Sequence, residues 1–544
     1  MNLQGFLGYF LVIQISSFLF TFRFFVAANR KWWEAAIPIY KTYILLQLIQ
    51  RPKWWLPLFL IPVINNVMAI IAAYELLYRF GYKKNIHIFL TIITFGLYMG
   101  YLNLTQKHEF GEKDSVDIKK RLGETIPALI FAVVVASVIR FFTFEAYTIP
   151  TPSMEKSMMV GDFLFVSKMH YGTRLPTTPL ALPLMHDRIP FINAPSFIDW
   201  FQLPYLRLPK FQSVARNEPF VFNYPMDSHM PLDKRMNYVK RCVGIPGDTL
   251  EIIDQVLYIN GAPSEFDANT RLQFTYYVRT NGQDFSKKVL KERFDIYYGS
   301  LEEMRSGYSF SDVQRINQSE YLITIAADLL PAFEKLSNVE RVVPLNVLSN
   351  SLDYPDTLPR LAIEYMTKYH APSNYIFPNP QEHTGRLPFA WTRDNYGPLV
   401  IPGKGETVEL NQENIHIYHR IIGFYEGNTL EYSEDGFFII NGEPAKNYTF
   451  KQDYFWAMGD NRHNSEDSRF WGFVPEDHVL GKPVFVWMSY DKFQESFLKR
   501  IRTERVFTLV NSKDEPRSYF IHFLVVAILL YGGNKLYQKK KAQA

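Results

Sequence analysis

The position of the apolar runs limits most strongly how this chain can fold, because they lie at both ends of the sequence around a long polar region. A helix needs about 20 mostly apolar residues to cross a lipid bilayer. Runs of roughly this length are Gly5 to Ala27, Trp54 to Leu77, Ile86 to Leu104, Ile126 to Tyr147 and Tyr519 to Tyr531, the last of which must extend to Leu536 and Tyr537. We therefore expect a multi-pass membrane protein with helical spans.

Basic residues in the short loops predict the orientation, since loops rich in Lys and Arg stay in the cytoplasm. Three clusters belong there: Arg30, Lys31, Lys41, Arg51 and Lys53; Lys119, Lys120 and Arg121; Lys535, Lys539, Lys540 and Lys541. Residues 148–517 would then lie outside the cytoplasmic membrane and the C-terminus inside. Arg79, Lys83 and Lys84 oppose this assignment, and a re-entrant hairpin there is the alternative. Ile37 to Gln50 is expected to be an interfacial helix.

Composition and residue counts narrow the possible functions. The net charge is only +4 over 544 residues, so no nucleic-acid partner is expected. Cys242 is the only cysteine, which excludes an intrachain disulfide and a Cys-rich metal site. The twelve histidines are scattered and form no HExxH motif, so we expect no metal and no cofactor.

The polar region has a sequence pattern typical of β-structure, in which short runs of Val, Ile, Phe and Tyr are separated by Gly, Pro, Asn and Asp. Helical periodicity is confined to its middle, at Ser319 to Leu336 and Leu361 to Lys368. The pattern predicts a β-rich extracytoplasmic domain that carries a large mixed α/β insertion.

Two segments of the polar region resemble each other. They are "KRCVGIPGDTLEIIDQVLYINGAP" from Lys240 and "HRIIGFYEGNTLEYSEDGFFIINGEP" from His419, and both contain Asn-Gly near their ends. Two copies are too few for a solenoid. We expect a repeated strand-and-hairpin unit, and a catalytic role for His419 is the alternative.

Ser153 in "PTPSMEK" is a candidate nucleophile, and two lysines could activate it. A serine hydroxyl needs a base within hydrogen-bond reach, and a lysine amine can be that base when burial lowers its pKa. Lys156 gives the Ser-x-x-Lys spacing of penicillin-binding proteins, but no Lys-Thr-Gly element accompanies it. Lys240 lies in the strand-like "NYVKRCVGIPGD", where apolar neighbours would surround it.

Three motifs in one order carry a family resemblance. "IPTPSMEKSMMVGDFLFVSK", "YVKRCVGIPGDTLEI" and "MGDNRHNSEDSRFWGFVP" resemble the boxes of type I signal peptidases, membrane-bound serine peptidases with a Ser/Lys dyad. The resemblance runs from Ile126 to about Phe507 except for the insertion. It departs from the family's Arg-Gly-Asp turn at Asn217 and Glu218, and it has charged residues at Glu155 and Lys156.

The resemblance implies a role for each matching residue. Ser153 would be the nucleophile and Lys240 the general base, with the Thr151 hydroxyl and the Ser153 N–H as the oxyanion hole. Ser465 would orient the lysine amine, and Asp467 and Arg469 would brace the loop as an ion pair. A substrate strand would lie beside residues from two segments: Tyr147, Ile149 and Pro150, and Asn237, Tyr238 and Val239.

The resemblance also implies the biology. The enzyme would act in the bacterial cytoplasmic membrane and cut signal peptides from exported preproteins after small residues of A-x-A type. Its partners would be preproteins, the lipid bilayer and the secretion machinery. The expected domains are 1–124, a membrane domain; 125–147, a helix leading to the catalytic domain; 148–262 and 416–507, the catalytic domain; 263–415, the insertion; and 508–544, a helix with a basic tail.

Two other functions are compatible with part of the sequence. One is an acyl transferase of the penicillin-binding type that uses Ser153 and Lys156. The other is an inactive membrane-anchored receptor or scaffold. The intact set of matching residues argues against the scaffold, since a decayed enzyme would be expected to lose at least one of them.

Overall fold

The computed structural model describes residues 3–94, 96–111, 125–299, 311–345, 376–378, 389–432, 438–491, 497–510, 514 and 517–543. The chain forms two compact units. The first comprises Met1–Phe144, Gly172–Pro209 and Ser228–Arg235. The second comprises Glu145–Tyr171, Lys210–Asp227 and Met236–Ala544.

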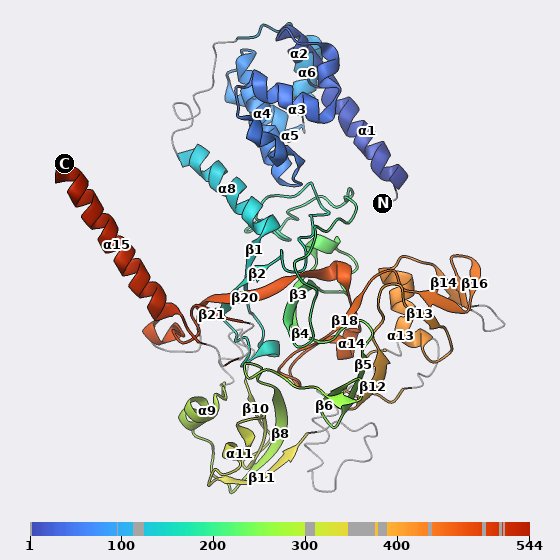
Figure 1. Ribbon diagram of the computed structural model, residues 1–544, viewed down its shortest axis with the longest axis vertical. Helices are drawn as coiled ribbons and strands as arrows, with labels where there is room; N and C mark the ends of the chain where they lie inside the picture. Colours follow the sequence, from blue (N-terminus) through green and yellow to red (C-terminus); the bar gives the residue numbers. More distant parts are fainter. Residues whose placement is uncertain are drawn as a thin grey trace. The chain divides into compact units, whose positions relative to one another are not determined.

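Helices dominate the first unit. They are α1 (Leu3–Leu19), α2 (Phe22–Ala27), α3 (Pro38–Leu48), α4 (Ile64–Arg79), α5 (Asn85–Ile93), α6 (Leu97–Thr105) and α8 (Thr125–Phe142), with 3₁₀ helices η1 (Trp32–Ala35) and η2 (Lys53–Leu60) (Figure 1). Phe24, Ile44 and Leu76 belong to one buried apolar cluster that joins α2, α3 and α4. The Arg51 guanidinium pairs with the buried Glu75 carboxylate at 2.5 Å. Because the partner is a cation, the buried carboxylate keeps a compensating charge.

Three of the predicted spans are divided in the structure. The first becomes α1 and α2, the second becomes η2 and α4, and the third becomes α5 and α6. Pro62 lies between η2 and α4, and Gly96, with φ +88°, precedes α6. Among the helices that the structure describes, none is by itself long and apolar enough to cross a bilayer; α5 and α6 reach that length and composition only as a pair bent by 119°.

The other predicted helices at the two ends are each found as one helix. α3 occupies most of the predicted interfacial segment. α8 covers the fourth apolar run as far as Phe142, and the end of that run forms a β-strand instead. The fifth run begins α15 (Phe520–Gln543), which continues into the basic tail.

An eight-stranded sheet organises the second unit, which confirms the predicted β-rich domain. Its order is β1-β2-β20-β3-β4-β18-β19, with β21 paired to β20 (Figure 1). The strands are β1 (Phe144–Thr148), β2 (Asp162–Ser167), β3 (Pro219–Asn223), β4 (Asn237–Gly244), β18 (Tyr454–Met458), β19 (Val474–Pro475), β20 (Val479–Ser489) and β21 (Thr508–Leu509). β3 and β4 pair antiparallel, with Lys240 of β4 opposite Phe220 of β3. Strands from both ends of the unit's sequence thus lie side by side.

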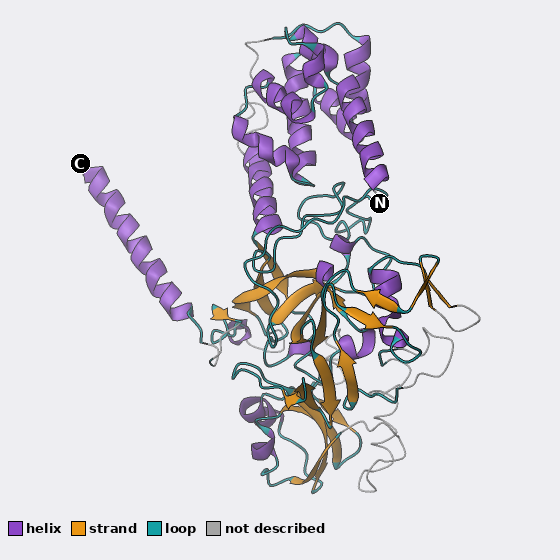
Figure 2. Cartoon of the chain, turned by 45° about the vertical axis from the view of Figure 1, so that its right-hand side comes forward, coloured by secondary structure: helices purple, strands orange, loops and turns teal. Residues whose placement is uncertain are grey.

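A second sheet lies within the predicted insertion. Its order is β11 (Val339–Pro344), β8 (Gln273–Thr280), β10 (Glu320–Ala326) and β9 (Val313–Arg315), with α9 (Lys287–Phe294) and α11 (Leu330–Phe333) beside it (Figures 1 and 2). The helix predicted over Ser319 to Leu336 is therefore wrong in its first half. "EYLITIA" pairs along β8 as a strand, because its alternate side chains are buried against the helices. The second predicted helix, Leu361 to Lys368, lies outside the described residues.

The repeated hairpin is confirmed, but the strand before it is not repeated. The first copy contains β5 (Thr249–Ile253) and β6 (Val256–Ile259), and the second contains β14 (Leu430–Tyr432) and β15 (Phe438–Ile440). Asn260 accepts a bond from the backbone N–H of Thr249 at 2.8 Å, and Asn441 accepts one from Thr429 at 3.0 Å. His419, however, lies in the helix α13 (Ile415–Arg420), whereas Lys240 lies in a strand.

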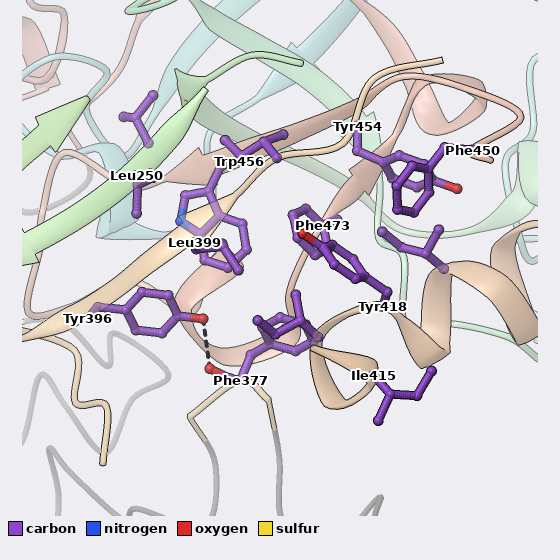
Figure 3. Packing of buried hydrophobic residues seen from close by; sticks show 14 of the residues in the cluster. Leu250, Phe377, Tyr396, Leu399, Ile415, Tyr418, Phe450, Tyr454, Trp456 and Phe473 are labelled. Carbon is purple, nitrogen blue, oxygen red and sulfur yellow. Dashed lines mark hydrogen bonds between the residues drawn. The ribbon is translucent and has the colours of Figure 1, made fainter. Parts of the chain in front are cut away.

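A large aromatic cluster supports the central strands. Figure 3 shows Trp456 of β18 packed near Leu250 of β5 and Leu399 of β12 (Tyr396–Val400). In the same cluster the Tyr396 hydroxyl donates to the Phe377 carbonyl at 2.7 Å. Since all these apolar side chains are buried, the cluster fixes the position of β18, which leads into the third sequence motif.

Candidate active site

The candidate nucleophile lies on a short turn just after the edge strand β1. Pro152–Met154 forms a single 3₁₀ turn, and Ser153 is buried within it. Pro152 suits the first position of such a turn because its fixed φ is already helical and it lacks the N–H that would have no partner there. The turn therefore holds Ser153 on a defined backbone.

The lysine that reaches this serine is Lys240 of β4. Its Nζ lies 2.6 Å from Ser153 Oγ, and the pair is buried. Burial lowers the pKa of Lys240 from 10.5 to about 8; Asp467, Glu466 and Asp460 oppose this shift, and the Arg469 guanidinium adds to it. An appreciable share of the amine is thus neutral near neutral pH and can accept a proton.

Lys156 has a different set of partners. Its Nζ lies 3.1 Å from a carboxylate oxygen of Asp295 and 3.9 Å from one of Asp312. Burial opposes the charged form, but the carboxylates of Asp312, Asp295 and Glu155 outweigh it and raise the pKa of Lys156. The Ser-x-x-Lys alternative requires a neutral amine at the serine, and the structure contradicts it on both position and charge.

The third sequence motif forms a buried brace beside the dyad. Arg469 donates to both carboxylate oxygens of Asp467, at 2.9 and 2.8 Å, and the same carboxylate accepts from the Gly459 N–H at 3.0 Å. A Cβ on Gly459 would lie 2.2 Å from Ser465 Oγ and 2.5 Å from the Ser153 carbonyl oxygen. Only glycine therefore allows this motif to lie so close to the Ser153 backbone.

Ser465 lies at this contact, but its hydroxyl makes no hydrogen bond to any residue that the structure describes. The side chain is buried. The predicted bond between Ser465 and the Lys240 amine is thus not formed in this arrangement, in which Ser153 is the amine's hydrogen-bond partner.

Sequence reasoning missed three residues that hold the site together. Asn461 donates to the Ser153 carbonyl through its backbone N–H at 3.1 Å and to the Pro152 carbonyl through its side chain at 3.2 Å. Arg241 makes a buried pair with Asp460 at 2.7 and 2.5 Å. All three lie inside the quoted motifs, next to residues that were identified, but only the fold shows what they contact.

The predicted substrate residues lie on two strand edges. β1 is the last strand of its sheet, and β18 pairs with β4 only from Arg241 onward within the described structure. Asn237, Tyr238 and Val239 therefore pair with β3 on one side and with no described strand on the other. The backbone of Ile149 is already paired: its N–H donates to the Asp162 carbonyl, and its own carbonyl accepts from the Gly161 N–H. A bound peptide would therefore have to pair with backbone groups of the residues next to Ile149, such as the Pro150 carbonyl.

The turn that departs from the resembled family keeps the conformation that glycine favours. Asn217 has φ +66°, and asparagine is among the residues that tolerate this region best. Its neighbour Glu218 forms an ion pair with Lys482, whose Nζ lies 2.5 Å from a carboxylate oxygen of Glu218. The substitution of Asn-Glu for Gly-Asp is thus compatible with the turn.

A buried serine hydroxyl bonded to a lysine amine is the arrangement of a hydrolase that works through a nucleophilic serine. Comparison with known proteins agrees: the chain matches the family described as "Signal peptidase, peptidase S26" over residues 122–321 and 400–488, more than half of its length. Residues 33–113 match a family of unknown function, DUF5684.

Individual relatives give the same result. The chain is 22% identical to a signal peptidase I of Buchnera aphidicola over 369 residues, which are 68% of this chain and 76% of that protein. It is 23% identical to signal peptidase I of Haemophilus influenzae over 407 residues, 73% of this chain and 79% of that protein. The chain belongs to the signal peptidase family, and it is a serine endopeptidase that removes signal peptides from preproteins.

Proposed function

We propose that Ser153 is the nucleophile of this peptidase and Lys240 its general base. The observation that carries the proposal is the buried 2.6 Å hydrogen bond between them. Ser153 Oγ attacks the scissile carbonyl carbon while its proton passes to the neutral Lys240 amine. The protonated lysine then gives that proton to the leaving amine of the mature protein, and the signal peptide remains as an ester on Ser153. Water, deprotonated by the same lysine, hydrolyses the ester.

Thr151 and the backbone N–H of Ser153 are the proposed oxyanion hole. The Thr151 backbone is extended, and its side chain does not cap the following turn. Thr151 is also exposed, so its hydroxyl is available to a substrate. Two donors aimed at the developing oxyanion would stabilise charge that exists only in the transition state.

Ser465, Asp467 and Arg469 have supporting roles in the proposal. The buried ion pair between Asp467 and Arg469 keeps the loop of the third sequence motif, residues 459–469 (the motif loop), against the Ser153 backbone. Ser465, buried and without a described partner, would accept a bond from Lys240 once the Ser153 bond is broken by acylation. This exchange would keep the amine oriented for the hydrolysis step.

The substrate is proposed to bind as an extended strand that ends in small residues of A-x-A type. Within the part of the chain that the structure describes, β1 and the first half of β4 each have an edge without a pairing strand, and these edges offer backbone groups for a peptide near Ser153. Tyr147, Ile149 and Pro150 would contact it from one side, and Asn237, Tyr238 and Val239 from the other. Alternate side chains of the peptide would then point into shallow pockets.

The proposed location is the bacterial cytoplasmic membrane, with several helical passes and the catalytic domain on the extracytoplasmic side. The basic clusters near the chain's ends support it, since such loops stay in the cytoplasm. There the enzyme would meet preproteins as they leave the secretion machinery, and the lipid bilayer would hold it close to the cleavage site.

The test follows cleavage of a preprotein with an Ala-x-Ala site by the full chain in membranes. Ser153→Ala and Lys240→Met are expected to abolish cleavage, because they remove the nucleophile and the base. Lys156→Met is expected to retain measurable cleavage, because it leaves both Ser153 and Lys240 in place. Lys482→Met, which removes another buried lysine of the same sheet, is the control for general damage. Cleavage by Lys240→Met, with Lys156→Met as inactive as Ser153→Ala, would contradict the assignment.

A further inference from the structure

Lys156 and the inserted sheet make a contact that the catalytic scheme does not use. Lys156 lies three residues after the nucleophile, and its side chain is 4% exposed. Its partners come from the insertion: Asp295 directly after α9, and Asp312 directly before β9. The Asp312 side chain is 1% exposed. A buried cation thus joins the nucleophile's loop to an element more than a hundred residues away in the sequence.

The backbone at Lys156 is held against its preference. Its φ is +71°, in the left-handed region that non-glycine residues rarely adopt. Such a conformation is unfavourable for a residue with a Cβ and persists only where the surroundings enforce it. Here the ion pairs to Asp295 and Asp312, together with a hydrogen bond from Nζ to the Asp295 carbonyl oxygen, hold the side chain. Glu155 is held by accepting from the Val160 N–H at 3.0 Å.

The insertion also holds the other side of the site. Gln273, the first residue of β8, donates to the Asp460 carbonyl at 2.9 Å and accepts from the Arg462 N–H at 3.0 Å. The Thr275 N–H donates to His463 Nδ1 at 3.0 Å. Asp460 and Arg462 flank Asn461, whose backbone N–H donates to the Ser153 carbonyl. The insertion therefore contacts both the loop of Ser153 and the loop of the third sequence motif.

We propose that Lys156 is a positioning residue, through which Asp295 and Asp312 of the insertion hold the Ser153 turn in register with Lys240. The proposal rests on the proposed role of Ser153 as nucleophile. It gives the insertion a function in catalysis: Asn461 fixes the turn from the motif side, and Lys156 fixes it from the insertion side. A hydroxyl displaced by even 1 Å would lose its alignment with both the base and the substrate carbonyl.

The test compares four variants of the full chain in membranes: Lys156→Met, Lys156→Arg, Asp312→Asn and Lys291→Met. Lys291 is the matched control, because its Nζ pairs with the same Asp295 at 2.7 Å, whereas none of its hydrogen bonds or ion pairs among the described residues joins it to the loop of Ser153. Cleavage rates are normalised to folded protein, and kcat and KM are measured separately. Thermal unfolding is followed in parallel.

Lys156→Met is expected to lower kcat by roughly 10- to 100-fold with KM changed by less than about twofold, since misplacement of a reacting group acts on the chemical step. Asp312→Asn should lower kcat in the same direction. Lys156→Arg, which keeps the charge, should restore most of kcat, and Lys291→Met should leave it unchanged.

Three results would overturn the proposal. The first is that Lys156→Met keeps the wild-type kcat and only its melting temperature falls. The second is that Lys156→Arg does not restore kcat. The third is that Lys291→Met loses as much kcat as Lys156→Met. Failure of the underlying dyad has a different signature. In that case Lys240→Met remains active, whatever Lys156→Met does.

Discussion

In the proposed mechanism, the charge of one buried amine, Lys240, determines when this site can work. Its pKa is lowered to about 8, mainly by burial. Because the neutral amine is the reactive form, kcat/KM should rise about tenfold per pH unit below pH 8 and level off above it. The measurement is cleavage of the preprotein between pH 6 and 10. Lys240→Arg should be inactive throughout, since an arginine keeps its proton in this range; a profile that levels off below pH 6 would contradict the assigned base.

Glu155, two residues from the nucleophile, should make stability fall as pH rises. Burial raises its pKa from 4.5 to about 7. Between pH 4.5 and about 7, Glu155 keeps its proton in the folded state and releases it in the unfolded state. The free energy of unfolding that this difference contributes at low pH is therefore lost as the pH rises to about 7. Glu155→Gln should reduce this fall and raise the melting temperature at pH 8. Thermal unfolding from pH 5 to 8 measures it, with exposed Glu413→Gln as the control; identical slopes in wild type and Glu155→Gln would refute the argument.

The contact between Ser153 and Lys240 could be predicted because each lies in a contiguous motif with a chemical requirement of its own. Ser153 needed a base, and only a buried lysine could serve as one. Lys156 could not be understood in this way. Its partners Asp295 and Asp312 are 139 and 156 residues away, and no local pattern indicates which distant carboxylates a lysine will meet.

At the scale of elements, the local turn chemistry was predicted better than the elements around it. The Asn-Gly hairpins at Asn260 and Asn441 fold alike because a positive φ at both positions suits this dipeptide. The stretch from Glu320 to Ala326 instead forms a strand, because pairing with β8 overrides its helical pattern. His419 likewise follows its own packing in α13 rather than its alignment with Lys240.

The motif loop before β19 should depend strongly on its buried ion pair. Arg469→Met would leave the Asp467 carboxylate buried without its cation, and breaking such a pair typically costs about 3–5 kcal/mol. We expect a large loss of thermal stability in the purified full chain. Arg315→Met, which breaks a solvent-exposed pair with Asp284, should cost only about 0–1 kcal/mol and is the matched control. Equal shifts in the two variants would show that the Asp467–Arg469 pair is not a brace.

At the scale of the whole molecule, the sequence indicated the division into helical ends and a β-rich middle, but not how the helical end is built. A run of apolar residues predicts where helices form, yet it does not show where they break. Pro62 and Gly96 lie inside runs that a hydropathy average treats as continuous. The breaks arise from missing N–H donors and from backbone conformation, which such an average does not include.

The orientation of the chain in the membrane can be tested with single thiols. Cys242 is the only native cysteine and is buried, so the wild type should not react with a membrane-impermeant maleimide. Gln283→Cys lies on an exposed turn of the insertion and Ala36→Cys on an exposed turn of the helical end. If the basic loops are cytoplasmic, right-side-out vesicles should label Gln283→Cys alone, and detergent should expose Ala36→Cys as well. Labelling of Ala36→Cys in sealed vesicles would invert the assignment, and it would place the proposed active site on the side where preproteins have not yet crossed.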